Sequence, residues 1–144
     1  MKKFLVIGNP IEHSLSPLLH NYWIKNNNIE AVYEKQKLDE NELKHLVSQV
    51  KEKKIEGINV TVPFKKAVIP FLDELSDEAE KTQSVNTIYL NNNKTIGHNT
   101  DIVGFETSIK KSNYDLNNKE VLILGAGGVV PSIIFALIRM KVSK

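Results

Sequence analysis

The chain contains no cysteine among its 144 residues. This absence excludes a disulfide framework, a thiolate nucleophile and a cysteine-based zinc site. It is also typical of proteins of the reducing cytoplasm, which is where we expect this protein to reside. The four histidines, His13, His20, His45 and His98, do not have the spacing of metal ligands. We therefore expect no metal site.

Long apolar runs and an excess of one charge are also missing. The apolar stretch 4–7 is followed by Gly8-Asn-Pro10 and is shorter than the roughly 7 to 15 residues of a signal-peptide core. No run approaches the roughly 20 residues of a membrane span. The 19 basic and 17 acidic residues give a net charge of only +2 and are mixed along the chain. We therefore expect neither a membrane nor a nucleic acid as a partner.

Strand-like and helix-like segments alternate through the first 112 residues. The alternation predicts an α/β fold with a mostly parallel sheet and helices on both faces. Ser16 is the predicted N-cap of the first helix, with Pro17 at the first helical position. The expected strands are 4–7, 31–38, 58–62, 85–90 and 95–97, and the expected helices begin near Leu18, Asp39, Phe64, Ser76 and Asp101.

A polar stretch, 112–119, separates this unit from a second pattern. An apolar strand is expected at 121–124, followed by Gly125-Ala-Gly-Gly128 and a helix over 131–140. Strand, glycine turn and helix resemble the first β-α unit of a Rossmann-like domain, in which phosphates bind at the helix N-terminus. Only the first two glycines fit the dinucleotide-binding pattern, so a tight turn without a ligand is the alternative. The predicted domains are residues 1–112 and 119–144.

Polar side chains gather where the strand 58–62 ends. Asn59 and Thr61 alternate with apolar residues, so they share one face of the sheet. Lys65 follows at the strand-to-helix corner, where open α/β sheets place their ligands. This set predicts a site for a small hydroxylated molecule. Its further members come from the segments Ser84-Val-Asn-Thr87 and Gly97-His-Asn-Thr-Asp101.

Together these motifs resemble those of shikimate dehydrogenase. They occur in the family's order along nearly the whole chain: Gly8-Asn-Pro-Ile-Glu-His-Ser-Leu-Ser-Pro17, Asn59-Val-Thr-Val-Pro-Phe-Lys65, Val85-Asn-Thr87, Asn99-Thr-Asp101 with Gly104-Phe105, and Gly125-Ala-Gly-Gly128. The resemblance implies NADP-dependent reduction of 3-dehydroshikimate to shikimate, in the shikimate pathway that leads to chorismate and the aromatic amino acids. Quinate/shikimate dehydrogenases share most of these motifs and are an alternative.

The resemblance also implies roles for individual residues. Ser14 and Ser16 would bind the substrate carboxylate, and Asn59, Thr61 and Asn86 the ring hydroxyls. Lys65 and Asp101 match the catalytic pair: the lysine can donate a proton and stabilise the oxyanion that hydride delivery creates, and the aspartate would orient it. The implied cofactor, NADP, would contact Gly125, Ala126, Gly127, Gly128 and Val129, with Asp77 as a further acidic position on the cofactor side.

Simpler interpretations remain for several of these residues. Ser16 and Asp101 could serve only as helix caps, and Asp77 is explained by the dipole of the helix after Ser76. Only 19 residues follow Gly125. We therefore expect an incomplete cofactor domain, no appreciable dehydrogenase activity of the chain alone, and a tendency to form a homodimer through the C-terminal segment. A non-enzymatic binding module and an inert α/β fragment are the alternatives to an enzyme.

Overall fold

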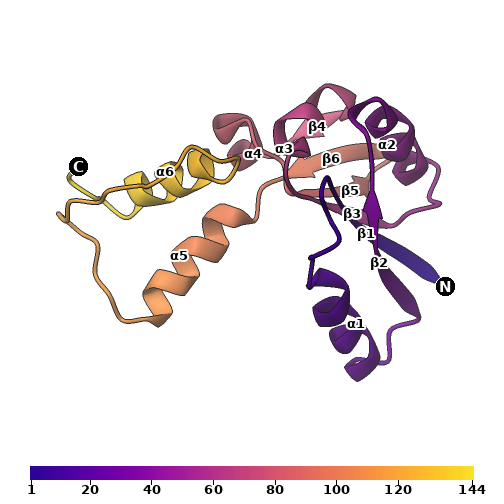
Figure 1. Ribbon diagram of the computed structural model, residues 1–144, viewed down its shortest axis with the longest axis horizontal. Coiled ribbons are helices and arrows are strands. Elements are labelled where there is room, and N and C mark those ends of the chain that lie inside the picture. Colours follow the sequence, from indigo (N-terminus) through magenta and orange to yellow (C-terminus); the bar gives the residue numbers. More distant parts are fainter.

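The computed structural model describes residues 1–144. Six strands form one sheet: β1 (Lys2–Gly8), β2 (Ala31–Lys37), β3 (Gly57–Val60), β4 (Glu74–Leu75), β5 (Thr87–Asn91) and β6 (Lys94–His98). Their order in the sheet is β2-β1-β3-β5-β6-β4 (Figure 1). β5 runs antiparallel to both of its neighbours, whereas every other pairing is parallel. The predicted α/β class with a mostly parallel sheet is confirmed.

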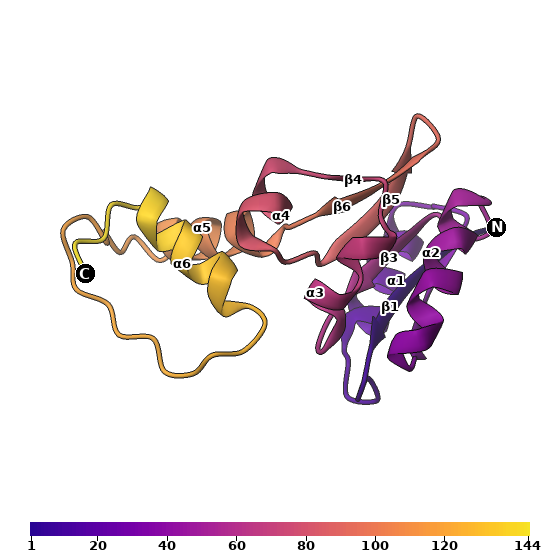
Figure 2. The same ribbon diagram turned by 90° about the horizontal axis from the view of Figure 1, so that it is seen from above.

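The helices are α1 (Ser16–Asn26), α2 (Leu43–Lys51), α3 (Phe64–Ala67), α4 (Asp77–Thr82), α5 (Asp101–Lys111) and α6 (Val130–Arg139), with short 3-10 turns η1 (Glu40–Glu42) and η2 (Ile69–Phe71). α1 lies on one side of the sheet, and α2 and α3 lie on the other (Figures 1 and 2). The prediction of helices on both faces is therefore confirmed. None of the helices has the length and apolar character needed to cross a membrane.

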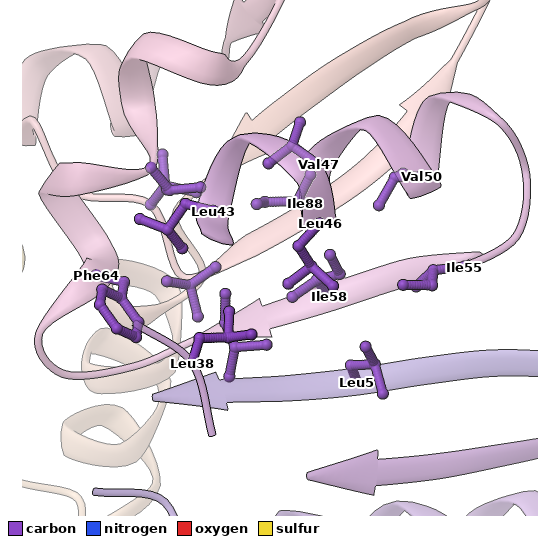
Figure 3. Packing of buried hydrophobic residues seen from close by; sticks show 14 of the residues in the cluster. Leu5, Leu38, Leu43, Leu46, Val47, Val50, Ile55, Ile58, Phe64 and Ile88 are labelled. Carbon is purple, nitrogen blue, oxygen red and sulfur yellow. The ribbon is translucent and has the colours of Figure 1, made fainter. Parts of the chain in front are cut away.

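The core is unevenly divided between the two faces of the sheet. On the α2 face, fifteen buried apolar residues form one cluster (Figure 3). The apolar stripe of α2, predicted from its helical spacing, packs there through Leu43, Leu46, Val47 and Val50. The α1 face has only a three-residue buried cluster of Val6, Ile11 and Tyr33. This thinner layer leaves room for polar side chains beside the sheet.

Two helix starts differ in their capping. Ser76 caps α4 as predicted, because its Oγ accepts a hydrogen bond from the Ala79 backbone amide at 3.3 Å. The prediction that Ser16 caps α1 was wrong. Ser16 is the first helical residue, and its backbone amide donates to Ser14 Oγ at 3.3 Å. The N-cap position is occupied by Leu15, and no side chain caps the start of α1.

The helices α5 and α6 pack against each other and extend away from the sheet (Figures 1 and 2). Helix α6 confirms the predicted helix after the glycine turn, but the strand expected at 121–124 was wrong. That segment forms no strand, and the side chains of Leu122 and Leu124 are 82% and 88% exposed. An apolar run forms a β-strand only when another strand pairs with it, and no strand lies next to residues 121–124. The domain division at 112–119 stays a prediction.

Candidate active site

Lys65 and Asp101 meet at the edge of the sheet, as the sequence predicts. Lys65 lies in the first turn of α3, directly after β3, and Asp101 is the first residue of α5. Lys65 Nζ is 2.6 Å from Asp101 Oδ2, and the two side chains are only 13% and 21% exposed. Partial burial lowers the effective dielectric around the pair, so their attraction exceeds that of a surface ion pair. The ammonium group of Lys65 is thus held by the Asp101 carboxylate in a position largely shielded from solvent.

The Asp101 carboxylate is fixed from several sides. Its Oδ2 accepts from Lys65, and its Oδ1 accepts a hydrogen bond from Asn86 Nδ2 at 2.8 Å. The Asp101 backbone amide donates to Asn99 Oδ1 at 3.0 Å. A carboxylate at the first position of a helix is further favoured by the helix dipole. These contacts fix the orientation of the Asp101 carboxylate toward Lys65.

Asn86 links this pair to the next strand. Its Oδ1 accepts from the Thr100 backbone amide and from Thr87 Oγ1, each at 3.0 Å. Thr87 Oγ1 in turn accepts a hydrogen bond from Asn59 Nδ2 at 3.2 Å. The predicted residues Asn59, Asn86, Lys65 and Asp101 therefore belong to one hydrogen-bonded set. Thr87, in the middle of that set, was quoted in a motif without a predicted role.

Tyr33 was missed by sequence reasoning. The residue is 4% exposed, and its hydroxyl donates to Asn59 Oδ1 at 2.7 Å. Burial raises the pKa of Tyr33 to about 12, so its hydroxyl stays a neutral donor. The His20 ring stacks on it with centroids 4.1 Å apart, and burial lowers the pKa of His20. The signal that could have found Tyr33 is a tyrosine on a predicted strand, because a buried tyrosine hydroxyl usually requires a hydrogen-bond partner.

Two pockets flank this set of residues. The first, which we call the serine pocket, has a volume of about 290 Å³ and brings Ser14 and Ser16 together with Thr61. Hydroxyl groups beside a helix start can hold an anion, because they add donors to a site already favoured by the helix dipole. The lining residues are Val6, Pro10, Ile11, His13, Ser14, Ser16 and Thr61.

The second, the glycine pocket, has a volume of about 540 Å³ and places Lys65 opposite the glycine turn. Gly125 has a φ of 118°, which only glycine adopts without strain, while a Cβ at Gly127 or Gly128 would meet nothing within 4 Å. The turn is thus open to a ligand. The lining residues are Val62, Pro63, Lys65, Lys66, Gln83, Ser84, Ala126, Gly127, Gly128, Val130 and Pro131.

Three predicted cofactor residues do not line the glycine pocket. Gly125 and Val129 flank the residues of the turn that do. Asp77 lies on α4 with its side chain 85% exposed and 3.7 Å from Lys81, one helical turn away. This exposed position in the first turn agrees with the simpler interpretation of Asp77 as a helix-dipole residue.

The fold and the site define an α/β domain with a lysine–aspartate pair beside two pockets. The model of the shikimate dehydrogenase substrate binding domain matches residues 6–88, more than half of the chain, and the chain belongs to this family.

The relatives extend this assignment. The shikimate dehydrogenase (NADP(+)) of Pelagibacter ubique is 61% identical over 143 residues, which are 99% of this chain and 54% of the relative. The crystal structure of shikimate dehydrogenase from Aquifex aeolicus superposes with a TM-score of 0.92 at 40% identity, over 99% of this chain and 53% of that one. For shikimate 5-dehydrogenase from Thermus thermophilus, in complex with NADP(H) and shikimate, the TM-score is 0.90 at 33% identity, over 99% and 54%. The chain spans about half the length of these relatives.

Proposed function

We propose that this chain provides the substrate site and the proton donor for the NADP-dependent reduction of 3-dehydroshikimate to shikimate, a step of aromatic amino acid biosynthesis in the cytoplasm. The observation that carries the proposal is the Lys65–Asp101 pair, with 2.6 Å between Nζ and Oδ2, within a set of short polar side chains. The names of the relatives support it, since each is called a shikimate dehydrogenase.

In this proposal the serine pocket holds the substrate carboxylate. The Ser14 and Ser16 hydroxyls would donate to it beside the start of α1, and Thr61 would contact the ring from the opposite wall. Asn59 and Asn86 would face the ring hydroxyls with amide groups whose orientation is already set by Tyr33 and Thr100. Amide and hydroxyl groups offer both donors and acceptors, which is what a polyol requires.

Lys65 would act as the general acid. As the substrate ketone is reduced, its oxygen gains negative charge, and the Lys65 ammonium group stabilises that charge and donates a proton to form the hydroxyl. The lysine becomes a neutral amine and regains a proton from solvent. Asp101 orients the ammonium group and accepts from a substrate hydroxyl. In the reverse reaction the neutral amine of Lys65 takes up the hydroxyl proton.

The residues of the glycine turn fit the pyrophosphate of a dinucleotide. The open turn at Gly127 and Gly128 would hold its pyrophosphate, with Ala126 beside it. When bound, NADPH supplies the hydride for the ketone carbon. Lys65 lines this same pocket, and its position there supports the role of proton donor.

The substrate half of the proposal is tested by titrating shikimate into the chain in a calorimeter. We expect saturable binding that weakens on Asp101→Asn, because this change removes the anionic partner of Lys65 and alters the donor pattern around Asn86. Lys51→Ala is the matched control, since it breaks an exposed ion pair with Asp73, 2.9 Å between Nζ and Oδ1, on another part of the surface. Absence of shikimate binding, or an equal loss in the control, would contradict the proposal.

The chemical half is tested by fusing residues 1–144 to the second half of the Pelagibacter ubique relative. In that fusion, Lys65→Ala should lower kcat for shikimate oxidation by about 100-fold or more while KM changes little, since general acid–base catalysis contributes roughly 10²–10⁴-fold. Near-normal kcat would rule out Lys65 as the proton-transfer group. If shikimate binds and the unmutated fusion does not reduce NADP, the chain is a binding module.

A further inference from the structure

Asn99 occupies a fully buried position at the junction between the sheet and the two outer helices. It lies in the link between β6 and α5, and none of its surface is exposed. Its Nδ2 lies 3.0 Å from Thr82 Oγ1, 3.0 Å from the Ser84 carbonyl oxygen and 2.8 Å from Ser132 Oγ. Its Oδ1 accepts from the Asp101 amide at 3.0 Å. One side chain thus contacts three separate segments: residues 82–84, the start of α5, and α6.

The partners of Asn99 belong to parts of the site that the sequence separates widely. Asp101 carries the carboxylate that orients Lys65, and Ser84 comes two residues before Asn86. Ser132 lies on α6, directly after the glycine turn, and it is also fully buried. The Thr82 hydroxyl donates to the Glu78 carbonyl oxygen at 2.6 Å, so it acts as an acceptor toward Asn99. The amide of Asn99 therefore joins the substrate side of the site to the glycine turn.

Two other contacts also help to fix the position of α6. Ser84 Oγ donates to the Gly128 carbonyl oxygen over a long distance of 3.4 Å. At the far end of α6, Arg139 Nε is 3.0 Å from Glu106 Oε1 on α5. Of the contacts near the glycine turn, the bond from Asn99 to Ser132 is the shortest and the most buried. A buried hydrogen bond from a side-chain amide is costly to break, because an unpaired polar group would remain in the interior.

We propose that Asn99 is a positioning residue: through Ser132 and the Asp101 amide, it sets the glycine turn and the Lys65–Asp101 pair at one fixed relative position. A proton donor and a hydride donor act on one carbonyl group only if both are held against it, so a displaced turn would cost rate as well as cofactor affinity. The consequence for the cofactor rests on the proposed function. The positional claim itself does not.

The position of α6 can be measured directly because the chain has no native cysteine. Lys44→Cys on α2 and Ile138→Cys on α6 are both exposed sites for spin labels. Electron–electron distance measurements then report where α6 sits relative to the sheet. We expect one narrow distance distribution for the labelled parent. Ser132→Ala removes the α6 acceptor of Asn99 and should broaden that distribution.

Thr82→Val is the matched control. It removes a different acceptor of the same Asn99 amide, on α4, and leaves the bond to Ser132 in place. The distance distribution of this variant should stay as narrow as that of the parent. A narrow distribution for Ser132→Ala, or equal broadening in both variants, would overturn the proposal. Both comparisons are made well below the melting temperature of each variant, checked by circular dichroism.

Ligand affinities of the unlabelled variants, measured in the fusion used to test the chemical half of the proposed function, provide a second readout that a merely structural role would not move. In Ser132→Ala we expect the Kd of NADP⁺ to rise about tenfold, the loss of roughly one buried hydrogen bond, while the Kd of shikimate stays within twofold. Equal losses for both ligands would contradict a positioning role. If NADP⁺ does not bind the parent, the cofactor part of the proposed function fails, and the distance distributions still decide the role of Asn99.

Discussion

Replacing Tyr33 with Phe removes a single hydroxyl from beneath the candidate substrate site and leaves the ring in place. That hydroxyl donates to Asn59 Oδ1 at 2.7 Å, from a residue only 4% exposed. Losing a buried hydrogen-bond partner costs about 1 to 3 kcal/mol. Asn59 is only partly buried, so water can replace some of the loss and we expect about 1 to 2 kcal/mol. For a chain of this size that is a fall in Tm of roughly 3 to 8 °C.

The substitution also has a pH signature whose sign follows from the pKa. Burial raises the pKa of Tyr33 to about 12, above the ordinary value of about 10. The stability that this neutral hydroxyl contributes is therefore complete below about pH 10 and is lost as the pH rises toward 12. Tyr33→Phe lacks the titrating group. The difference in unfolding free energy between parent and variant should shrink across this window.

Urea unfolding followed by circular dichroism, from pH 7 to pH 12, measures both effects. Tyr22→Phe is the matched control, because Tyr22 is 61% exposed on α1, and its stability should follow that of the parent. Shikimate affinity should fall in Tyr33→Phe as well, since the Asn59 amide loses the donor that orients it. Unchanged stability together with unchanged shikimate affinity would refute the assigned role of Tyr33.

Three further changes test other parts of the structure. The double change of Ser14 and Ser16 to Ala should weaken the binding of shikimate by at most a few kcal/mol, at roughly 1.5 to 3 kcal/mol per charged hydrogen bond. The same change should barely affect the binding of the methyl ester of shikimate. Equal losses for the acid and the ester in calorimetry would contradict the assignment of the carboxylate to the serine pocket. Hydrogen bonds from the Thr95 amide and from Lys51 lower the pKa of Asp73 to about 2, so the stability advantage over Asp73→Asn should be complete above about pH 4 and disappear as the pH falls toward 2. Gly97→Ala should cost about 1 to 3 kcal/mol in urea unfolding, because the added Cβ would lie 2.5 to 2.9 Å from three side-chain carbons, whereas Gly104→Ala in the open on α5 should be neutral or stabilising.

The local sequence pattern was sufficient to predict most helices and strands of the first 112 residues. The stripe of α2 has the period of a helix, and the hairpin of β5 and β6 has an asparagine-rich turn between its two strands. Each of these signals lies within one element, where spacing alone decides which side chains face the core. The two-residue strand β4 was not predicted, because two residues cannot show a period of two.

Signals that depend on distant partners could not be read. The segment 121–124 has the composition of a buried strand, but a strand requires a neighbour, and composition does not show whether one is present. Asn99 has the same limitation. Its sequence context, directly before a helix, suggests a local capping role. In the structure its buried side-chain amide donates a hydrogen bond to Ser132, 33 positions later. The roles of Lys65 and Asp101 as a catalytic pair came only from the family resemblance, and their contact joins residues 36 positions apart.

The corner between β3 and α3 connects the two pockets. Thr61 lines the serine pocket and Lys65 lines the glycine pocket, and the chain between them turns through a hydrogen bond from the Phe64 amide to the Thr61 carbonyl oxygen at 2.9 Å. Phe64 is 2% exposed and packs in the main core (Figure 3). On the other side, a Cβ at Gly8 would lie 2.7 Å from Thr61 Cγ2, so β1 closes tightly against the corner. Core packing therefore fixes the backbone that carries Lys65, and a change at Phe64 or Gly8 should move Lys65 relative to Thr61 and the serine pocket.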